Sequence, residues 1–291
     1  MTQHKIYQKG ARPVRSKELL DFYNTTTPAE VTMAEYENTW REWINYTDTK
    51  TLEGLDNFPT AHYTQGTSQA FDNFILRHCK DRQINALLGD FQYHACQGKH
   101  VDFAYIDDIN SDRFVGRGLN ALIISAPFSD FGCMHPGFER MMRICCTLDI
   151  PVCLDLAYWG ICKNINIDLD KYPCIEEVVF SLSKPFFPLE THRVGIRFSR
   201  LPVDDGVTMI NDVGYQNKTS MNLGVHFMKH FDPDWNWNKH ETAYKQICDS
   251  ENLAYTDTLL FGLGDEERHY MYSRGVPGNF RVCISDFMSD C

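Results

Sequence analysis

Short apolar runs alternate with amphipathic stretches through the middle of the chain. Residues 122–125, 150–154 and 178–182 have the length and composition of buried strands, and residues 194–198 alternate apolar side chains with others. Residues 136–148 repeat apolar side chains at helical spacing. Strands that alternate with helices predict βαβ units, and therefore an α/β fold whose mostly parallel sheet has helices on both faces.

The pattern changes on both sides of this region. Helical spacing occurs near residues 16–22 and 34–44, within an otherwise polar and irregular stretch. Toward the C-terminus, residues 220–231 and 235–250 have helical spacing, and residues 280–285 have the pattern of a strand.

We therefore predict three parts. They are a partly helical N-terminal segment (1–57), a large α/β domain (58–200) and a reduced α+β C-terminal domain (201–291).

Composition narrows the class of protein. The chain has 291 residues, of which 43% are hydrophobic and 23% charged, as in a soluble globular protein. The formal net charge is −11, and no stretch is dense in Lys and Arg, which argues against nucleic acid or an anionic membrane as a partner. A small anionic ligand stays possible, because it needs only a few local donors.

The cysteines and the first residues indicate a compartment. No two of the 11 cysteines have C-x-x-C spacing, so we expect free thiols in a reducing compartment and no metal site. The first residues lack the apolar core of a signal peptide, and no apolar run approaches the roughly 18 residues of a membrane span. We expect a cytoplasmic protein.

Reactive side chains follow the predicted strands, at the point where each strand ends. Asp155 and Tyr158 come after residues 150–154, and Lys184 comes after residues 178–182. Because parallel strands end at the same edge of a sheet, we expect these side chains to meet there. The full set near these ends is Gly66, Thr67, Ser68, Ser129, Asp155, Tyr158, Ser181, Ser183, Lys184 and Arg193.

This set suits a phosphorylated aromatic aldehyde. A lysine amine in a dry pocket loses its proton readily and forms a Schiff base. A carboxylate such as Asp155 keeps a pyridine nitrogen protonated, and a tyrosine such as Tyr158 donates a hydrogen bond to a phenolic oxygen. The Gly-Thr-Ser turn at residues 66–68 offers backbone N–H groups to a phosphate, with Arg193 as a charged clamp.

Residues 58–200 and 278–286 resemble the fold-type I pyridoxal-phosphate-dependent aminotransferases of class I/II. An S-x-S-K segment followed by R-V-G, with D-x-A-Y upstream and an arginine-bearing strand near the C-terminus, carries the resemblance by its order and spacing. The matching segments are YTQGTSQAFDNF, LLGDFQYH, NALIISAPFSDFG, IPVCLDLAYWG, VVFSLSKPFFPLETHRVGIRFSR and NFRVCIS.

The resemblance implies a role for each matched residue. Lys184 is the Schiff-base lysine and proton carrier, Asp155 pairs with the pyridine nitrogen, and Tyr158 with the phenolic oxygen. Phe91 stacks on the cofactor, and Arg281 grips the substrate α-carboxylate, for which a planar guanidinium is the natural partner. The phosphate-binding residues are Gly66, Thr67, Ser68, Ser181, Ser183 and Arg193.

The resemblance also implies an activity and an assembly. The expected reaction moves an amino group between an amino acid and a 2-oxo acid, in a homodimer whose active site lies at the subunit interface. The chain departs from the family in three ways: Ser129 replaces a usual asparagine, the spacing from Lys184 to Arg193 is one residue longer, and the N-terminal segment is shorter. Ser129 and the shorter N-terminal segment keep other reactions open. The rivals are pyridoxal-phosphate-dependent elimination, replacement, cyclisation or racemisation, and a cofactor-binding homologue without turnover.

Several features stay open at this level. Tyr23, Tyr36 and Tyr46 are alternatives for the tyrosine that a partner subunit normally supplies in such enzymes. His226 and His230 have the spacing of two zinc ligands, but without an apparent third ligand a packed or solvated helix face is the preferred interpretation. Residues 232–237 form an aromatic lid or a packed loop.

Overall fold

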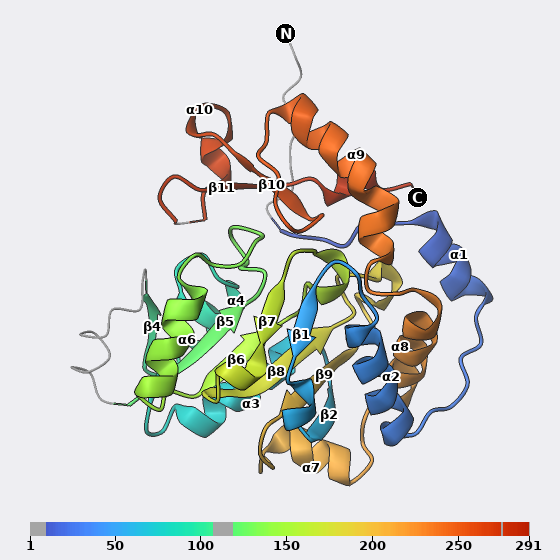
Figure 1. Cartoon of the computed structure of the whole chain (residues 1–291). Coiled ribbons are helices and arrows are strands. Elements are labelled where there is room, and N and C mark those ends of the chain that lie inside the picture. The colour runs from blue at the N-terminus through green and yellow to red at the C-terminus, as the bar shows by residue number, and fades with distance from the viewer. Residues whose placement is uncertain (1–9, 107–118, 275, 291) are drawn as a thin grey trace.

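A seven-stranded sheet forms the centre of the molecule. The structure, a computed structural model, describes residues 10–106, 119–274 and 276–290. In these ranges the large sheet has the strand order β2-β9-β8-β6-β5-β3-β4, and β9 is antiparallel to both of its neighbours (Figure 1). The strands are β2 (Thr60–Thr64), β3 (Gln83–Leu87), β4 (Phe103–Ile106), β5 (Asn120–Ser125), β6 (Val152–Asp155), β8 (Ile175–Ser181) and β9 (Gly195–Ser199). The predicted mostly parallel α/β fold is confirmed.

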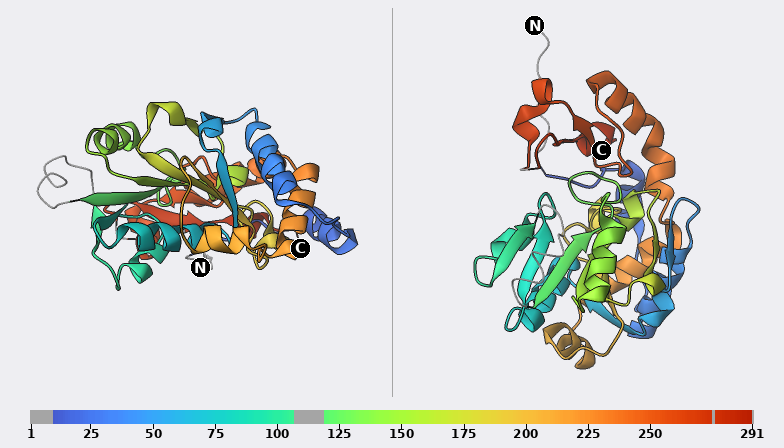
Figure 2. Two further views of the ribbon diagram at one scale, coloured as in Figure 1. Left: turned by 90° about the horizontal axis from the view of Figure 1, so that it is seen from below. Right: turned by 60° about the vertical axis from the view of Figure 1, so that its left-hand side comes forward.

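Helices cover both faces of this sheet. The helices are α1 (Lys17–Thr25), α2 (Met33–Asn45), α3 (Thr67–His78), α4 (Tyr93–Gln97), α6 (Phe138–Thr147), α7 (Gly206–Asp212), α8 (Lys218–His230), α9 (Trp235–Glu251) and α10 (Glu266–His269). Strand β5 shows why two layers are needed: Ala121 and Ile123 pack in a core with α3, whereas Leu122 and Ile124 pack in the main core with α2, α6 and α8. The two helical layers are seen edge-on in Figure 2.

The C-terminal elements form a second core beside the sheet. Strands β10 (Phe261–Gly264) and β11 (Phe280–Cys283) pair antiparallel, and α9 packs with them and with Val14 and Ile161. Figure 1 shows these elements above the ends of the large sheet's strands. Helix α7 instead contacts strand β2 of the large sheet, and helix α8 contacts helix α2. The three-part division of the chain stays a prediction.

A short accessory sheet completes the described elements. Strands β1 (Thr51–Glu53) and β7 (Asn166–Asp168) pair parallel beside the large sheet. Short 3-10 helices lie at Leu55–Asn57, Trp159–Ile161, Leu169–Lys171, Phe187–Leu189, Tyr270–Tyr272 and Ser285–Met288. No helix in the described ranges is long and apolar enough to span a membrane.

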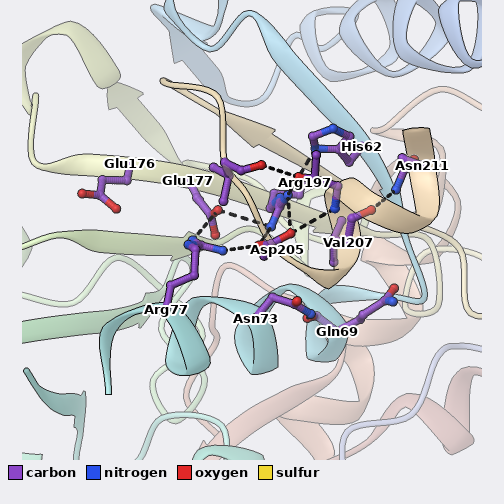
Figure 3. A network of polar contacts seen from close by, with 12 residues as sticks. His62, Gln69, Asn73, Arg77, Glu176, Glu177, Arg197, Asp205, Val207 and Asn211 are labelled. Atoms are coloured by element: carbon purple, nitrogen blue, oxygen red, sulfur yellow. Dashed lines mark hydrogen bonds and ion pairs between the residues drawn. The ribbon is translucent and has the colours of Figure 1, made fainter. Parts of the chain in front are cut away.

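A buried network of charges ties α3 and α7 to the sheet (Figure 3). Arg197 of β9 lies 2.5 Å from Asp205 and 3.5 Å from Glu177 of β8, and Arg77 of α3 reaches both carboxylates. Burial opposes ionisation of Asp205, yet the hydrogen bond and charge of Arg197 hold its pKa at about 2. Asp205 also caps α7 by accepting from the Thr208 N–H. Two guanidinium groups therefore balance two carboxylates.

Removing one member of this network is expected to be costly. Arg197→Met leaves buried Glu177 and Asp205 with only Arg77, and breaking a buried pair costs about 3–5 kcal/mol. Urea unfolding measures this loss in the free energy of unfolding. The control Arg143→Met removes a surface arginine whose side chain is 72% exposed, and its effect should stay within about 0.5 kcal/mol. Equal effects in the two variants would contradict the expectation.

Candidate active site

A cavity of about 250 Å³ lies between the carboxyl ends of the large sheet's strands and the C-terminal strands. Strands β5, β6 and β8 supply its floor through Ser125, Asp155 and Ser181, the last residue of each. The sequence-predicted residues that line it are Thr67, Ser68, Phe91, Ser129, Asp155, Tyr158, Ser181, Ser183, Lys184, Arg193 and Arg281. The structure thus brings these residues together around one space.

One end of the cavity is built for an anion. Gly66 precedes α3 with a φ of 72°, and a Cβ there would lie 2.9 Å from a guanidinium nitrogen of Arg193. Only glycine therefore allows Arg193 to approach the start of α3 this closely. Arg193 itself has a φ of 57° and donates to the Ser68 hydroxyl at 3.3 Å. The helix N-terminus and the guanidinium both favour negative charge at this place.

Hydroxyl groups continue this end of the cavity. The Ser181 and Ser183 hydroxyls lie 2.8 Å apart, and both side chains are buried. Each hydroxyl is able to donate to an anion as well as to its neighbour. Gly66, also predicted as a site residue, is not among the residues that line the cavity; it precedes α3 at this end.

Lys184 stands next to these serines with its amine in the cavity. Burial lowers the pKa of Lys184, Glu190 opposes this shift, and the charges of Arg193 and Arg281 add to it. The Nζ atom donates to the backbone carbonyl of Ala11 at 2.6 Å. A lysine with a lowered pKa is more readily deprotonated, which is the condition for attack on a carbonyl carbon.

Asp155 lies in the same cavity at the end of β6. It accepts a hydrogen bond from the Ala157 N–H at 2.9 Å. Burial raises the pKa of Asp155 to about 8, and the nearby Asp90 carboxyl adds to the shift. Asp90 is buried as well and accepts from the Ser125 hydroxyl at 2.5 Å. A buried carboxyl of this kind favours a ligand atom that carries positive charge, because the ion pair restores ionisation.

Arginines from the C-terminal part line the opposite wall. Arg281 of β11 donates to the Ser129 carbonyl at 2.8 Å, and its guanidinium lies over the Phe261 ring at 5.0 Å. Burial raises the pKa of Tyr158, whereas the charges of Arg281 and Arg274 oppose the shift. Tyr158 thus lies within the electrostatic influence of both arginines.

Other lining residues were not predicted from the sequence. Arg274 comes from the loop before β11, and Glu190 from the turn before Arg193. Gly10 and Ala11 belong to the N-terminal segment, and only the three-dimensional structure brings them to the cavity. The remaining lining residues of this kind are Gln92, Ser125, Pro127 and Ala157.

The three candidate tyrosines lie in different surroundings. Tyr36 is buried and donates to the Gly195 carbonyl, and Tyr23 pairs with His192 at 2.9 Å, so both are used within this chain. Tyr46 is 74% exposed, away from the cavity. Phe91 is 39% exposed and stacks on Tyr93, with the ring centroids 5.8 Å apart.

The histidine pair and the aromatic segment both pack. His226 and His230 stack on the Phe22 ring, and His226 contacts the Thr26 hydroxyl at 3.0 Å. Trp237 is buried in the second core, and Asp234 forms an ion pair with buried Lys50. In the described ranges we found no cluster of three His, Cys, Asp or Glu side chains placed to hold a metal.

Comparison with known proteins places the fold. No protein-family model matches the sequence, and no curated protein matches it. A solved PLP-bound C-S lyase from Staphylococcus hominis superimposes with a TM-score of 0.70 at 13% identity, over 94% of this chain and 82% of that one. The tyrosine aminotransferase of Leishmania infantum gives 0.63 at 14% identity, over 97% and 90%. The aspartate aminotransferase of Rhizobium meliloti gives 0.65 at 9% identity, over 94% and 87%.

These likenesses define a class of fold. The chain has the fold of the aminotransferases and of the C-S lyase that shares their architecture. At identities this low, the likeness shows the architecture alone. Function must be argued from the cavity.

Proposed function

We propose that this protein binds pyridoxal 5'-phosphate and uses it as an aminotransferase that moves an amino group between an amino acid and a 2-oxo acid. The observation that carries the proposal is the shared cavity of Lys184 and Asp155. An amine of lowered pKa and a buried carboxyl meet there beside a built anion site. The PLP-bound C-S lyase with this fold supports the choice of cofactor.

The residues present fit this cofactor. Its phosphate matches the start of α3, Ser68, Ser181, Ser183 and Arg193, because a dianion satisfies N–H, O–H and guanidinium donors together. Its pyridine nitrogen matches Asp155, whose buried carboxyl favours a cationic partner.

The aldehyde and ring oxygen of the cofactor have partners as well. The aldehyde matches the Lys184 amine, and the phenolic oxygen matches the Tyr158 hydroxyl. Phe91 supplies a ring for stacking at the cavity mouth. We propose these as the cofactor-binding roles of the matched residues.

The chain's own groups then act on the substrate. When bound, the cofactor supplies an electrophilic carbon that joins amines and a ring that accepts an electron pair. Arg281 binds the α-carboxylate of the amino acid through its planar guanidinium. Lys184 takes the α-proton and returns it to the acceptor carbon, and Asp155 holds the ring nitrogen in its charged form.

Elimination is the second candidate outcome. A C-S lyase shares the fold, and the resemblance described above implies an asparagine where this chain has Ser129. Ser129 has a shorter side chain, which leaves Tyr158 as the main partner of the phenolic oxygen. The same proton removal by Lys184 serves a lyase, so the substrate decides the outcome. A homologue that binds the cofactor without turnover is the third candidate.

Incubation with single amino acids separates these candidates. Addition of pyridoxal phosphate to the purified protein should produce a visible absorbance band from the lysine-bound cofactor. In a transaminase, an amino acid without a 2-oxo acid acceptor bleaches this band and yields one 2-oxo acid per site, without ammonia. Ammonia released over many turnovers would indicate elimination. A band that no amine alters would indicate binding without turnover, and no band at all would refute the proposal.

We also propose a homodimer. The resemblance places the site of such enzymes at a subunit interface, and the described N-terminal segment supplies only Gly10 and Ala11 to this cavity. Light scattering of the cofactor-loaded protein measures the mass directly. A monomer that turns over would refute this part of the proposal.

A further inference from the structure

Arg274 is a second guanidinium group in the cavity, beyond the one assigned to the substrate α-carboxylate. It lines the cavity from the loop before β11, and its side chain is 10% exposed. The amine and guanidinium groups of the described lining residues are Lys184, Arg193, Arg274 and Arg281, whereas the carboxyl groups are Asp155 and Glu190. The lining thus carries more positive than negative groups.

The contacts of Arg274 within the chain are long. Its Nη1 atom lies 3.5 Å from an Asp130 carboxyl oxygen and 3.5 Å from the Ser129 hydroxyl. A charge-assisted hydrogen bond is typically about 2.7–2.9 Å long. The other carboxyl oxygen of Asp130 accepts from Asn279 at 2.7 Å, and Asn279 also donates to the Asp130 carbonyl at 2.8 Å. Asn279, rather than Arg274, holds Asp130 in place.

Arg274 also stands near a like charge. Burial lowers the pKa of Arg274, and the positive charge of Arg281 adds to the shift. Both arginines lie 3.5 Å from the Ser129 hydroxyl. Two guanidinium groups that converge on one hydroxyl in a buried wall repel each other; Asp130 opposes this effect on the pKa of Arg274, and a ligand anion beside Arg274 and Arg281 would offset it further.

The proposed function accounts for the other positive groups. A phosphate dianion pairs with Arg193, the cofactor aldehyde takes up the Lys184 amine, and an α-carboxylate pairs with Arg281. Arg274 is the cation to which this assignment gives no ligand group, and the ion pair that it forms in the described part of the chain is the 3.5 Å contact with Asp130. Because this contact is long and Asn279 already donates to the Asp130 carboxyl, a substrate anion offers Arg274 a stronger partner.

We propose that Arg274 binds a second acidic group on the substrate, so that the enzyme acts on amino acids with an anionic side chain and on the matching dicarboxylic 2-oxo acids. This inference rests on the proposed function for the reaction, but the anion site itself is testable without turnover. Arg281 takes one carboxylate and Arg274 the other. Neutral side chains of equal size leave Arg274 with only its long contact to Asp130.

Binding of unreactive acids tests the second anion site directly. Malonate, succinate and glutarate are compared with propionate, butyrate and valerate, which match them in length but carry one charge. Thermal unfolding at rising ligand concentration gives each dissociation constant, with or without the cofactor. The best dicarboxylate is expected to bind about 10–150-fold more tightly than its monocarboxylate partner, the fold-change that corresponds to one hydrogen bond to a charged group.

Arg274→Gln is the decisive variant. It should remove most of this preference and leave the monocarboxylate dissociation constant within about threefold of wild type. Arg268→Gln, which changes the same charge at an exposed position on α10, should keep the full preference. Equal binding of both acids by the wild type overturns the proposal. A preference for the dicarboxylate that persists in Arg274→Gln overturns it too. An equal loss of affinity for both acids also overturns it, because such a loss indicates that Arg274 has a structural role beside Asp130.

The reaction gives an independent reading. In cofactor-loaded protein, glutamate or aspartate should bleach the visible band at least about tenfold faster at low concentration than glutamine or asparagine. Absence of the band with an intact dicarboxylate preference would refute the cofactor assignment and keep the anion site. A normal band with no acidic preference would refute the anion site and keep the cofactor.

Discussion

Lys184→Ala should abolish the covalent attachment of pyridoxal phosphate and with it the visible absorbance band. Lys184 is the only lysine among the described residues that line the cavity, and the lowered pKa of its amine suits attack on an aldehyde. The variant also loses the group that moves the proton. General acid–base catalysis alone contributes about 10²–10⁴-fold, so turnover should fall by at least that factor.

Absorbance, borohydride trapping and mass spectrometry measure the attachment. The matched control is Lys80→Ala, because Lys80 is an exposed lysine outside the cavity. Its trapped cofactor and turnover should equal those of the wild type. Lys184→Ala also removes the hydrogen bond to the Ala11 carbonyl, so melting curves must first show that the variant folds. A folded Lys184→Ala protein that still traps the cofactor would refute the role of Lys184.

The regular part of this fold was predictable because its strands are buried on both faces. Apolar runs at residues 122–125, 150–154 and 178–182 correspond to β5, β6 and β8, within two or three residues at each end. A central parallel strand is apolar over most of its length, and this leaves a clear signal. Strands β2, β3 and β4 were not predicted. Strand β3 reads Gln-Ile-Asn-Ala-Leu, and its buried Asn85 donates to Asn120, which interrupts the apolar pattern.

The same geometry explains which site residues were predictable. Asp155 and Ser181 are the last residues of buried strands and Lys184 comes three residues after Ser181, so a rule about strand ends finds them. Arg274 and Ala11 were missed because loops from distant parts of the chain bring them to the cavity. Ala11 meets Lys184 across 173 residues of sequence, and no local pattern encodes such a contact. The buried charges of Arg197 and Glu177 were missed for another reason. Each lies in a strand that is otherwise mainly apolar, and only the packing of the strands in three dimensions shows which opposite charge it contacts.

Asp155→Asn should change the stability of the unliganded protein and the turnover of the cofactor-loaded enzyme. Asparagine keeps an oxygen that accepts from the Ala157 N–H, but it carries no charge at any pH. In the cofactor-loaded enzyme the ring nitrogen loses its anionic partner. Truncating one member of a buried charge pair costs about 2–5 kcal/mol, so we expect turnover to fall roughly 30-fold to 10³-fold or more. Lys184 remains, so the cofactor should still be trapped by borohydride.

The pH dependence of stability gives a second measurement on the same pair of proteins. The pKa of Asp155 is about 8 when folded, against about 4 in an unfolded chain. Between these values the unliganded native state holds a proton that the unfolded state has lost. The free energy of unfolding therefore falls as pH rises from about 4 to 8, by at most about 1.4 kcal/mol per pH unit from this group.

Asp155→Asn removes that slope, so the variant should be the more stable protein near pH 8 without cofactor and nearly equal to wild type near pH 4. Asp90, with a pKa of about 6, contributes its own part of the slope in both proteins and cancels in the difference. Urea titrations at several pH values measure the difference. With pyridoxal phosphate bound, the order should reverse, because an ion pair with the ring nitrogen then stabilises the charged Asp155. The assignment of Asp155 fails if cofactor stabilises both proteins equally at every pH.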